Sequence, residues 1–132
     1  MNTTIVIYSA PVNSQAPNSA LQFARAWLAA GHSIERVFFY RDGVYTAAAS
    51  LAPQSDEQNI HDMWQDFAQH HNIDLVACIA AALRRGVIDI SEAERFARPS
   101  ANLGESFRLG GLGELVEACL KSDRTVSFGR HA

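Results

Sequence analysis

Apolar residues in this chain follow two patterns: short runs rich in β-branched residues, and longer segments with helical spacing. The short runs are typical of buried strands, because both faces of such a strand are apolar. Ile5-Val6-Ile7-Tyr8 and Val37-Phe38-Phe39-Tyr40 are the clearest examples. The pattern predicts five strands, at residues 4–9, 34–40, 75–78, 106–109 and 125–128.

The longer segments predict helices with one apolar face each. Two of these helices are expected to open at capping boxes, Ser55-Asp56-Glu57-Gln58 and Ser91-Glu92-Ala93-Glu94. Residues 44–54 are expected to form a loop. The predicted helices cover residues 19–30, the segment from the first capping box to residue 72, residues 79–85, the segment from the second capping box to just before Pro99, and the segment from Gly111 to about Ser122.

Strands that alternate with helices imply a parallel sheet with right-handed crossovers and helices on both faces. The chain has 132 residues, which are enough for one domain with a hydrophobic core. No repeat, linker or low-complexity segment interrupts the alternation. The sequence therefore predicts a single α/β domain over residues 1–132, with three layers (α/β/α).

Composition narrows the classes of function. A hydrophobic content of 48% and a charged content of 19% fit a folded globular protein. The net charge of −3 argues against broad binding of nucleic acid or acidic membranes, which needs a basic face. The two cysteines do not make a disulfide framework, and neither a signal peptide nor a membrane span is visible. We expect a cytoplasmic protein whose thiols stay reduced.

Cys78 is the leading candidate for chemistry, because it ends a predicted strand and a helix follows at once. In open α/β sheets, ligand-binding and active sites lie just outside the carboxyl ends of the strands. Free N–H groups at the start of a helix favour a thiolate. Free cysteine is also among the most buried residue types, so the residues alone leave open a purely packed Cys78. Arg84 and Arg85 lie roughly 9–10 Å further along the helix. They could stabilise the negative end of the helix dipole as readily as the thiolate.

Other candidate residues have structural explanations. Cys119 falls in a repeat with Leu112, Leu115, Val116 and Leu120 that predicts the buried face of an amphipathic helix. The two cysteines lack Cys-x-x-Cys spacing, and the scattered histidines supply no zinc signature. His61, His70 and His71 fall on or beside one predicted helix and cannot be assigned as a base for Cys78. Gly110-Gly111-Leu112-Gly113 lacks the spacing of a phosphate loop. Pocket candidates from topology alone are Tyr8, Ser9 and the turn Asp42-Gly43-Val44-Tyr45.

Several segments together resemble the TusD/DsrE family of sulfur-relay proteins, nearly end to end and in order. The segments are residues 19–24, 38–44, 78–87, 111–119 and 123–126. The resemblance implies a mostly parallel five-stranded sheet with flanking helices, an architecture like that of flavodoxin. It also implies a sulfurtransferase in which Cys78 accepts sulfane sulfur as a persulfide and passes it on. Such a thiol must be reached by a partner's cysteine, so we expect Cys78 not to be fully buried.

The resemblance implies partners as well. The family works as a heterohexamer with two homologous subunits, TusB-like and TusC-like, and takes sulfur from a TusA-like donor. The acceptor is a TusE/DsrC-like protein with a cysteine near its C-terminus. We expect the relay to serve 2-thiouridine formation in tRNA; the alternative is dissimilatory sulfur oxidation. Persulfide exchange needs no metal, nucleotide or flavin, and we expect neither direct nucleic-acid binding nor membrane association.

Two other classes of function compete with the relay. One is a non-catalytic subunit that serves assembly, in which Cys78 is only packed; the presence of a cysteine at the matching position argues against it. The other is a flavodoxin-like module for a small molecule, which no phosphate loop in the sequence supports.

Overall fold

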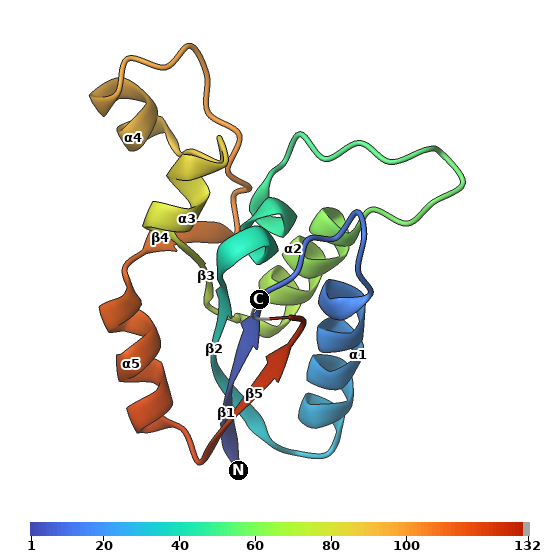
Figure 1. The fold of residues 1–132 in the computed structure, drawn as a ribbon. Helices are drawn as coiled ribbons and strands as arrows, with labels where there is room; N and C mark the ends of the chain where they lie inside the picture. Colours follow the sequence, from blue (N-terminus) through green and yellow to red (C-terminus); the bar gives the residue numbers. More distant parts are fainter. Residues whose placement is uncertain (131–132) are drawn as a thin grey trace.

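Five strands form one parallel sheet in the computed structural model, which describes residues 1–130 (Figure 1). The sheet order is β4-β3-β2-β1-β5, and every pairing is parallel. The predicted α/β class and five-stranded sheet are therefore confirmed, while residues 131 and 132 of the predicted domain lie outside the described part. The strands are β1 (Asn2–Ile7), β2 (Ser33–Phe39), β3 (Leu75–Cys78), β4 (Phe107–Gly110) and β5 (Arg124–Phe128).

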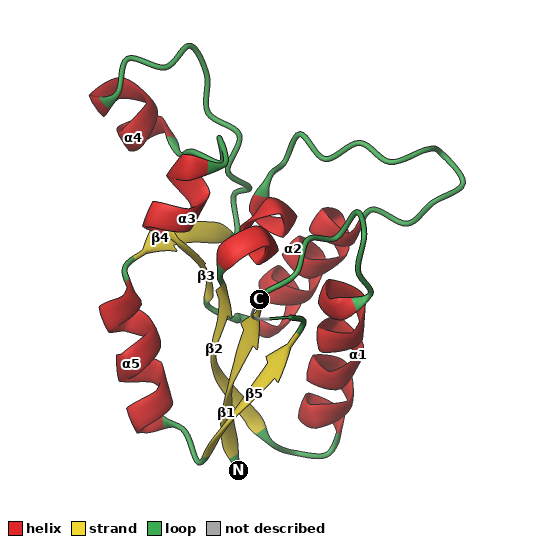
Figure 2. Ribbon diagram, in the orientation of Figure 1, coloured by secondary structure: helices red, strands yellow, loops and turns green. Residues whose placement is uncertain are grey.

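Helices cover both faces of the sheet and one of its ends. Figure 2 shows α5 on one face, α1 and α2 on the other, and α3 and α4 beyond the carboxyl end of β3. A short 3₁₀ helix, η1, follows β2. The bounds are α1 (Ala16–Ala29), η1 (Arg41–Ala47), α2 (Ile60–His71), α3 (Ile79–Arg84), α4 (Ile90–Arg95) and α5 (Leu112–Lys121).

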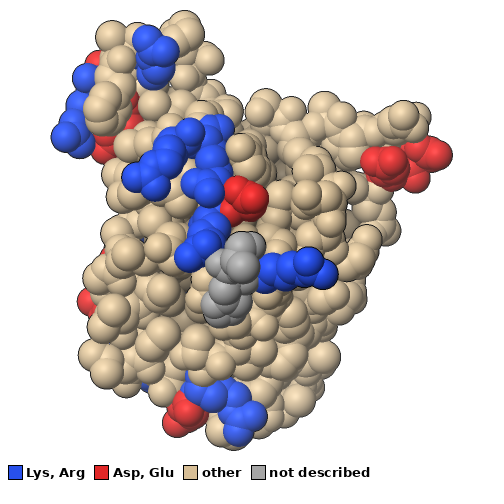
Figure 3. All heavy atoms as spheres, viewed as in Figure 1, with Lys and Arg blue, Asp and Glu red and all other residues tan. Residues whose placement is uncertain are grey.

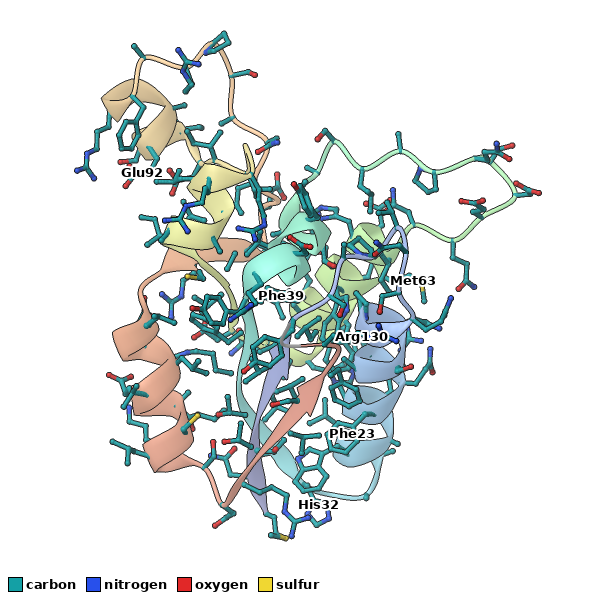
Figure 4. The ribbon with its side chains drawn as sticks, viewed as in Figure 1. Phe23, His32, Phe39, Met63, Glu92 and Arg130 are labelled. Atoms are coloured by element: carbon teal, nitrogen blue, oxygen red, sulfur yellow. The ribbon has the colours of Figure 1, made fainter. Side chains whose placement is uncertain are left out.

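The main core lies under α1 and α2. Phe39, which is labelled in Figure 4, lies at the end of β2. Its ring packs edge-on against Trp64 of α2. Both side chains are fully buried, and the Trp64 indole N–H donates to the carbonyl of Pro17 at 3.0 Å. On α1, Phe23 packs against Phe128 of β5 with ring centroids 5.6 Å apart. Aromatic side chains bury large apolar areas, so these contacts hold α1 and α2 to the sheet.

Both predicted capping boxes are wrong, because each helix begins at a different cap. α2 begins after Asn59, whose side chain accepts a hydrogen bond from the N–H of Asp62 at 3.2 Å. Ser55 lies instead in a turn that the Glu57 N–H closes on the carbonyl of Gln54. α4 begins after Asp89, which accepts from the N–H of Glu92 at 2.8 Å. Asn and Asp cap as well as Ser, so similar signals a few residues apart compete.

The segment predicted as a loop, 44–54, is partly helical, since η1 extends to Ala47. The turn predicted at Asp42-Gly43 is part of η1 instead, and Gly43 is buried there. A Cβ on Gly43 would collide with the carbonyl oxygen of Ile7. This close approach lets η1 pack tightly over the end of β1.

The apolar face of α5 that the sequence predicts to be buried is largely exposed in the structure. Leu112, Val116 and Leu120 are 47%, 58% and 82% exposed, so most of the predicted apolar stripe faces outward. Ala118 is the helix residue that is fully buried. The stripe is displaced because charged groups hold the helix to the sheet.

An ionic network lies between α5 and the sheet. Asp74, just before β3, binds Arg36 of β2 at 2.7 Å and Arg108 of β4 at 2.9 Å. Arg108 also binds Glu114 of α5 at 2.5 Å, and Arg36 donates to the carbonyl of Glu114 at 2.7 Å. Hydrogen bonds to Asp74 raise the pKa of Arg108, against the effect of burial. The arginines under α5 are therefore used to fix the helix in place.

Candidate active site

Cys78 is the last residue of β3 and directly precedes α3. Its partner in the β3–β4 ladder is Gly110, the last residue of β4. From β3 the chain continues outward to β4 through α3 and α4, whereas from β4 it returns through α5 to β5 on the other side of β1. Cys78 and Gly110 therefore lie where the chain direction reverses. Open α/β sheets bind ligands outside the carboxyl ends of strands at such a reversal.

A cavity of about 440 Å³ opens beside Cys78, and we call it the Cys78 cavity. The ends of β2, β3 and β4 supply its walls, together with one side of α3 and the first residues of η1 and α5. The lining residues are Tyr40, Arg41, Cys78, Ile79, Ala80, Ala81, Arg84, Arg85, Gly111 and Leu112.

Cys78 itself is only 2% exposed. The expectation that this thiol would be partly open to solvent is therefore wrong. The thiol lies at the end of a strand that is buried on both faces, and η1, α3 and β4 surround that end. A reacting group must enter the cavity to reach the sulfur.

Positive charge gathers around the cavity. Arg85 binds Asp42 at 2.8 Å and also donates to the carbonyl of Ala81 at 3.0 Å, so its position is fixed. Arg41 and Arg84 also line the cavity, and within residues 1–130 neither has a carboxylate in salt-bridge distance. A site with cations that are not neutralised favours an anionic sulfur. The structure thus brings Arg84 and Arg85 to the same cavity as Cys78, which helical spacing alone could not decide.

Arg41 holds an uncommon backbone conformation, with a φ of 50°. Few residues other than glycine adopt positive φ, and such strain clusters at functional sites. The conformation turns the chain from β2 into η1 beside the cavity. Sequence reasoning missed Tyr40, Arg41 and Leu112 as lining residues. Their position at strand ends and at a helix start was the available signal.

Two helix starts meet at the cavity. No side chain caps α3, and α5 begins after Gly111, which also offers no side-chain cap. Their first N–H groups carry partial positive charge, which adds to that of the arginines. Gly110 lets α5 begin this close to the sheet, because a Cβ there would lie 2.7 Å from Val76 and would collide with Glu114. Gly110 therefore allows the helix start to lie close to the sheet, and Gly110 and Gly111 do not have the spacing of a phosphate loop.

The other candidates lie elsewhere. Cys119 is half-buried on α5. His61 is buried beneath η1, where its Nδ1 lies 2.8 Å from the carbonyl of Thr46 and its ring stacks on Phe107. His70 and His71 end α2, as expected for a polar helix terminus. Among the lining residues of the Cys78 cavity there is no histidine.

A second, more polar cavity of about 870 Å³ adjoins the first at the same edge of the sheet. Tyr8, Ser9 and Asp42, which topology alone selected, line this second cavity, together with Arg41 and Arg85 that both cavities share. Across residues 1–130 no cluster of three or more His, Cys, Asp or Glu side chains is arranged to hold a metal ion. No helix in that range is both long and apolar enough to span a membrane.

The model of the DsrE/DsrF-like family matches residues 1–128. The chain belongs to this family. The sulfurtransferase TusD of Salmonella newport is 48% identical over 128 residues, which cover 97% of this chain and 100% of that protein. The sulfurtransferase TusD homolog of Pseudomonas aeruginosa is 46% identical over 129 residues, or 98% of both chains. The candidate sulfurtransferase DsrE of Allochromatium vinosum is 43% identical over 98% of this chain and 99% of its own length.

The fold has a counterpart among solved structures. The crystal structure of the ychN protein from E. coli matches with a TM-score of 0.75 and 21% identity, covering 97% of this chain and 100% of that chain. At this identity the likeness supports the fold alone. The family predicted from the sequence is thus confirmed, and the relatives named above are sulfurtransferases or a candidate for one.

Proposed function

We propose that this chain is a sulfurtransferase that accepts sulfane sulfur as a persulfide on Cys78 and passes it to a cysteine of a partner protein. The observation that carries the proposal is the position of Cys78. It lies at the carboxyl end of a parallel strand, in a cavity with two arginines that no carboxylate of residues 1–130 neutralises. Nearly half of the chain is identical to proteins named as sulfurtransferases, over almost its full length.

The chemistry needs only thiols. The Cys78 thiolate attacks the outer sulfur of the donor's persulfide; a new S–S bond forms and the donor cysteine leaves as its thiolate. The acceptor's thiolate then attacks the outer sulfur of the Cys78 persulfide, and Cys78 leaves as a thiolate. In each step one S–S bond forms and one S–S bond breaks, so the sulfur atoms undergo no net oxidation or reduction. No oxidant, metal or cofactor is consumed. Arg41 and Arg84 stabilise the anionic sulfur in each state.

We propose further that the relay operates in the cytoplasm for 2-thiouridine formation in tRNA. The TusD relatives, at 46% and 48% identity, support this branch, because the family resemblance links TusD-type proteins with tRNA thiolation and DsrE-type proteins with dissimilatory sulfur oxidation. The proposed partners are two homologous subunits like TusB and TusC, a TusA-like donor and a TusE/DsrC-like acceptor. The exposed stripe on α5 supports the idea of partner subunits, because apolar side chains there lack cover in the single chain.

Mass spectrometry after incubation with a persulfide donor tests the sulfurtransferase activity. We expect one added sulfur atom, mapped to the peptide that contains Cys78. Cys78→Ser should abolish the addition, and Cys119→Ala should leave it within about twofold of the parent, because Cys119 lies outside the Cys78 cavity. A persulfide found mainly on Cys119 would contradict the assignment. A Cys78 that accepts no sulfur would favour the non-catalytic subunit.

Co-expression with homologous subunits tests the assembly. We expect light scattering to give a hexamer of two copies of each subunit. An isolated chain that stays monomeric and transfers sulfur as fast as any mixture would show that the heteromer is not needed.

A further inference from the structure

The second cavity, of about 870 Å³, has a volume typical of sites for small molecules, and the proposed relay does not use it. It lies at the carboxyl edge of the parallel sheet, where folds of this class bind ligands. Residues that end or follow β1, β2 and β5 line it, together with the start of α1. Its walls include the hydroxyl and amide side chains of Ser9, Asn13, Ser14, Gln15 and Ser19, so they suit a hydrophilic ligand.

The charges that line the second cavity do not cancel. Three arginines, Arg41, Arg85 and Arg130, line it together with one carboxylate, that of Asp42. Asp42 pairs with Arg85 at 2.8 Å, and neither Arg41 nor Arg130 has a carboxylate in salt-bridge distance within residues 1–130. In Figure 3, one red group lies among the blue Lys and Arg atoms near the centre of the view. The chain as a whole carries a charge of −3, so this excess of positive charge is local.

Arg130 is placed at this cavity by the close approach of β5 to β1. The chain at Gly129 has a φ of 104°, and a side chain there would collide with Ser9. The N–H of Arg130 donates to the Oγ of Ser9 at 3.0 Å. Arg130, labelled in Figure 4, lines the cavity together with the start of α1, which has no acidic residue in its first turn. The partial positive charge of this helix start therefore adds to that of the arginines.

Arg41 and Arg85 line both the second cavity and the Cys78 cavity, but they differ in how firmly they are held. Arg85 is fixed by Asp42 and by the carbonyl of Ala81. Arg41 is exposed, and its guanidinium carbon lies 5.9 Å from the centroid of the Tyr40 ring, which lines the Cys78 cavity. Arg41 is therefore the charge that can serve an anion in either cavity.

We propose that the second cavity binds a small polyanion, a molecule with at least two carboxylate or phosphate groups, and that its binding lowers the reactivity of Cys78. One anionic group pairs with Arg130 and another with Arg41. The Cys78 thiolate then loses the stabilising charge of Arg41. The coupling is reciprocal, because a thiolate that engages Arg41 weakens the binding of the polyanion. The regulatory part rests on the proposed function, since it acts on the thiol of that reaction.

Isothermal titration calorimetry with pyrophosphate, citrate and acetate tests the site, at an ionic strength held constant with potassium chloride. We expect pyrophosphate or citrate to bind one site per chain, and acetate, with a single carboxylate, to bind far more weakly. Arg130→Ala should raise the Kd about fivefold, and Arg130→Lys should restore part of the loss. Arg25→Ala is the matched control, because Arg25 is exposed on α1 and does not line the cavity. Tighter binding of pyrophosphate would assign a phosphorylated ligand, and tighter binding of citrate a polycarboxylate.

Alkylation by iodoacetamide, a small uncharged reagent, measures the reactivity of Cys78 without any persulfide. The full chain with Cys119→Ala supplies a single reacting thiol. We expect a saturating concentration of the tighter-binding probe to slow the alkylation about fivefold. Arg130→Ala should show the same maximal slowing at a higher probe concentration. Arg41→Ala, compared at its own saturating concentration, should lose most of the slowing, because the shared charge is absent.

Heats that follow ionic strength alone, or equal losses of affinity in Arg130→Ala and Arg25→Ala, would overturn the polyanion site. Slowing that persists unchanged in Arg41→Ala would overturn the coupling through Arg41. If the probe binds and slows alkylation as expected but Cys78 accepts no persulfide, the proposed function fails and the polyanion site stands. If Cys78 accepts persulfide and no probe binds, the polyanion site fails and the proposed function stands.

Discussion

Cys78 ends a strand at the carboxyl edge of the sheet, whereas Cys119 lies on the helix that covers one face of it. Cys119 is the more exposed of the two, yet it lines neither the Cys78 cavity nor the second cavity beside it. The cations beneath its helix, Arg36 and Arg108, are already paired with carboxylates. Beside the buried Cys78, Arg41 and Arg84 have no carboxylate in salt-bridge distance within the described chain.

The contrast shows that exposure alone is a poor guide to a reactive thiol. What differs between the regions is how their charges are used. Under α5, Arg36 and Arg108 pair with carboxylates, and these ion pairs hold the helix against the sheet. At the Cys78 cavity, positive charge is left available for an anion that the single chain does not supply.

Gly110 joins the two regions, so its substitution should break the comparison most strongly. A methyl group at Gly110 would lie 2.7 Å from a side-chain carbon of the fully buried Val76 and would collide with the carboxylate of Glu114, which is held by Arg108. We expect Gly110→Ala to lower the free energy of unfolding in urea by about 2–3 kcal/mol, as overpacking does.

Gly113→Ala is the matched control, because no atom lies within 4 Å of its added Cβ. Gly113 is in the first turn of α5, where alanine forms helix better than glycine. The control should therefore be unchanged or more stable by up to about 1 kcal/mol. Equal destabilisation by both substitutions would show that the fit of Gly110 against Val76 is not the cause.

The two thiols should also differ in their response to the size of a reagent. N-ethylmaleimide is small enough to enter the Cys78 cavity, whereas a maleimide on a polyethylene glycol chain is not. In single-cysteine variants, we expect the ratio of the small to the large reagent's rate to be about tenfold higher at Cys78 than at Cys119, equivalent to 1.4 kcal/mol. Similar ratios at both sites would mean that the Cys78 cavity opens readily in solution.

The sequence predicts most of the fold but less of the site. Apolar runs were sufficient for β1, β2 and β3, because a strand buried on both faces leaves a continuous apolar signal. The two edge strands carry exposed residues, Arg108 in β4 and Arg124 in β5, and their signal in the sequence is weaker. The caps at Asn59 and Asp89 were missed, since several capping residues lie close together. The exposure of Val116 could not be predicted either. Whether a helix packs through its apolar stripe or through ion pairs depends on side chains from distant strands, such as Arg36 and Arg108.

The site shows the same limit. The position of Cys78 between a strand and a helix is local in sequence and was predicted, as was its neighbourhood with the turn at Asp42. Its burial depends on η1, α3 and β4 packing around the strand end, which no local pattern records. The placement of Arg41 and Arg84 at one cavity likewise depends on tertiary structure.

The smallest expected effect concerns the ionic network that holds α5. Burial opposes ionisation of the Asp74 carboxyl, but hydrogen bonds from Arg108 and Arg36 outweigh it, so the pKa of Asp74 lies below its usual range. A carboxyl with a lowered folded-state pKa stabilises the protein above its unfolded value, near 3.9. That stabilisation is lost as the pH falls through the folded-state value.

Asp74→Asn removes the charge and keeps the shape of the side chain. We expect it to lower the free energy of unfolding by about 1 kcal/mol at neutral pH, because the group is partly exposed and water screens the pairs. The difference between the parent and the variant should shrink as the pH falls below about 5, because the parent's carboxyl takes up a proton first in the unfolded chain and, at lower pH, in the folded protein. Urea unfolding at several pH values measures it. A difference that stays constant down to pH 3 would assign the loss to shape or hydrogen bonding.

Because Asp74 anchors α5 and lies away from the Cys78 cavity, labelling by the large maleimide should rise at Cys119 and stay unchanged at Cys78.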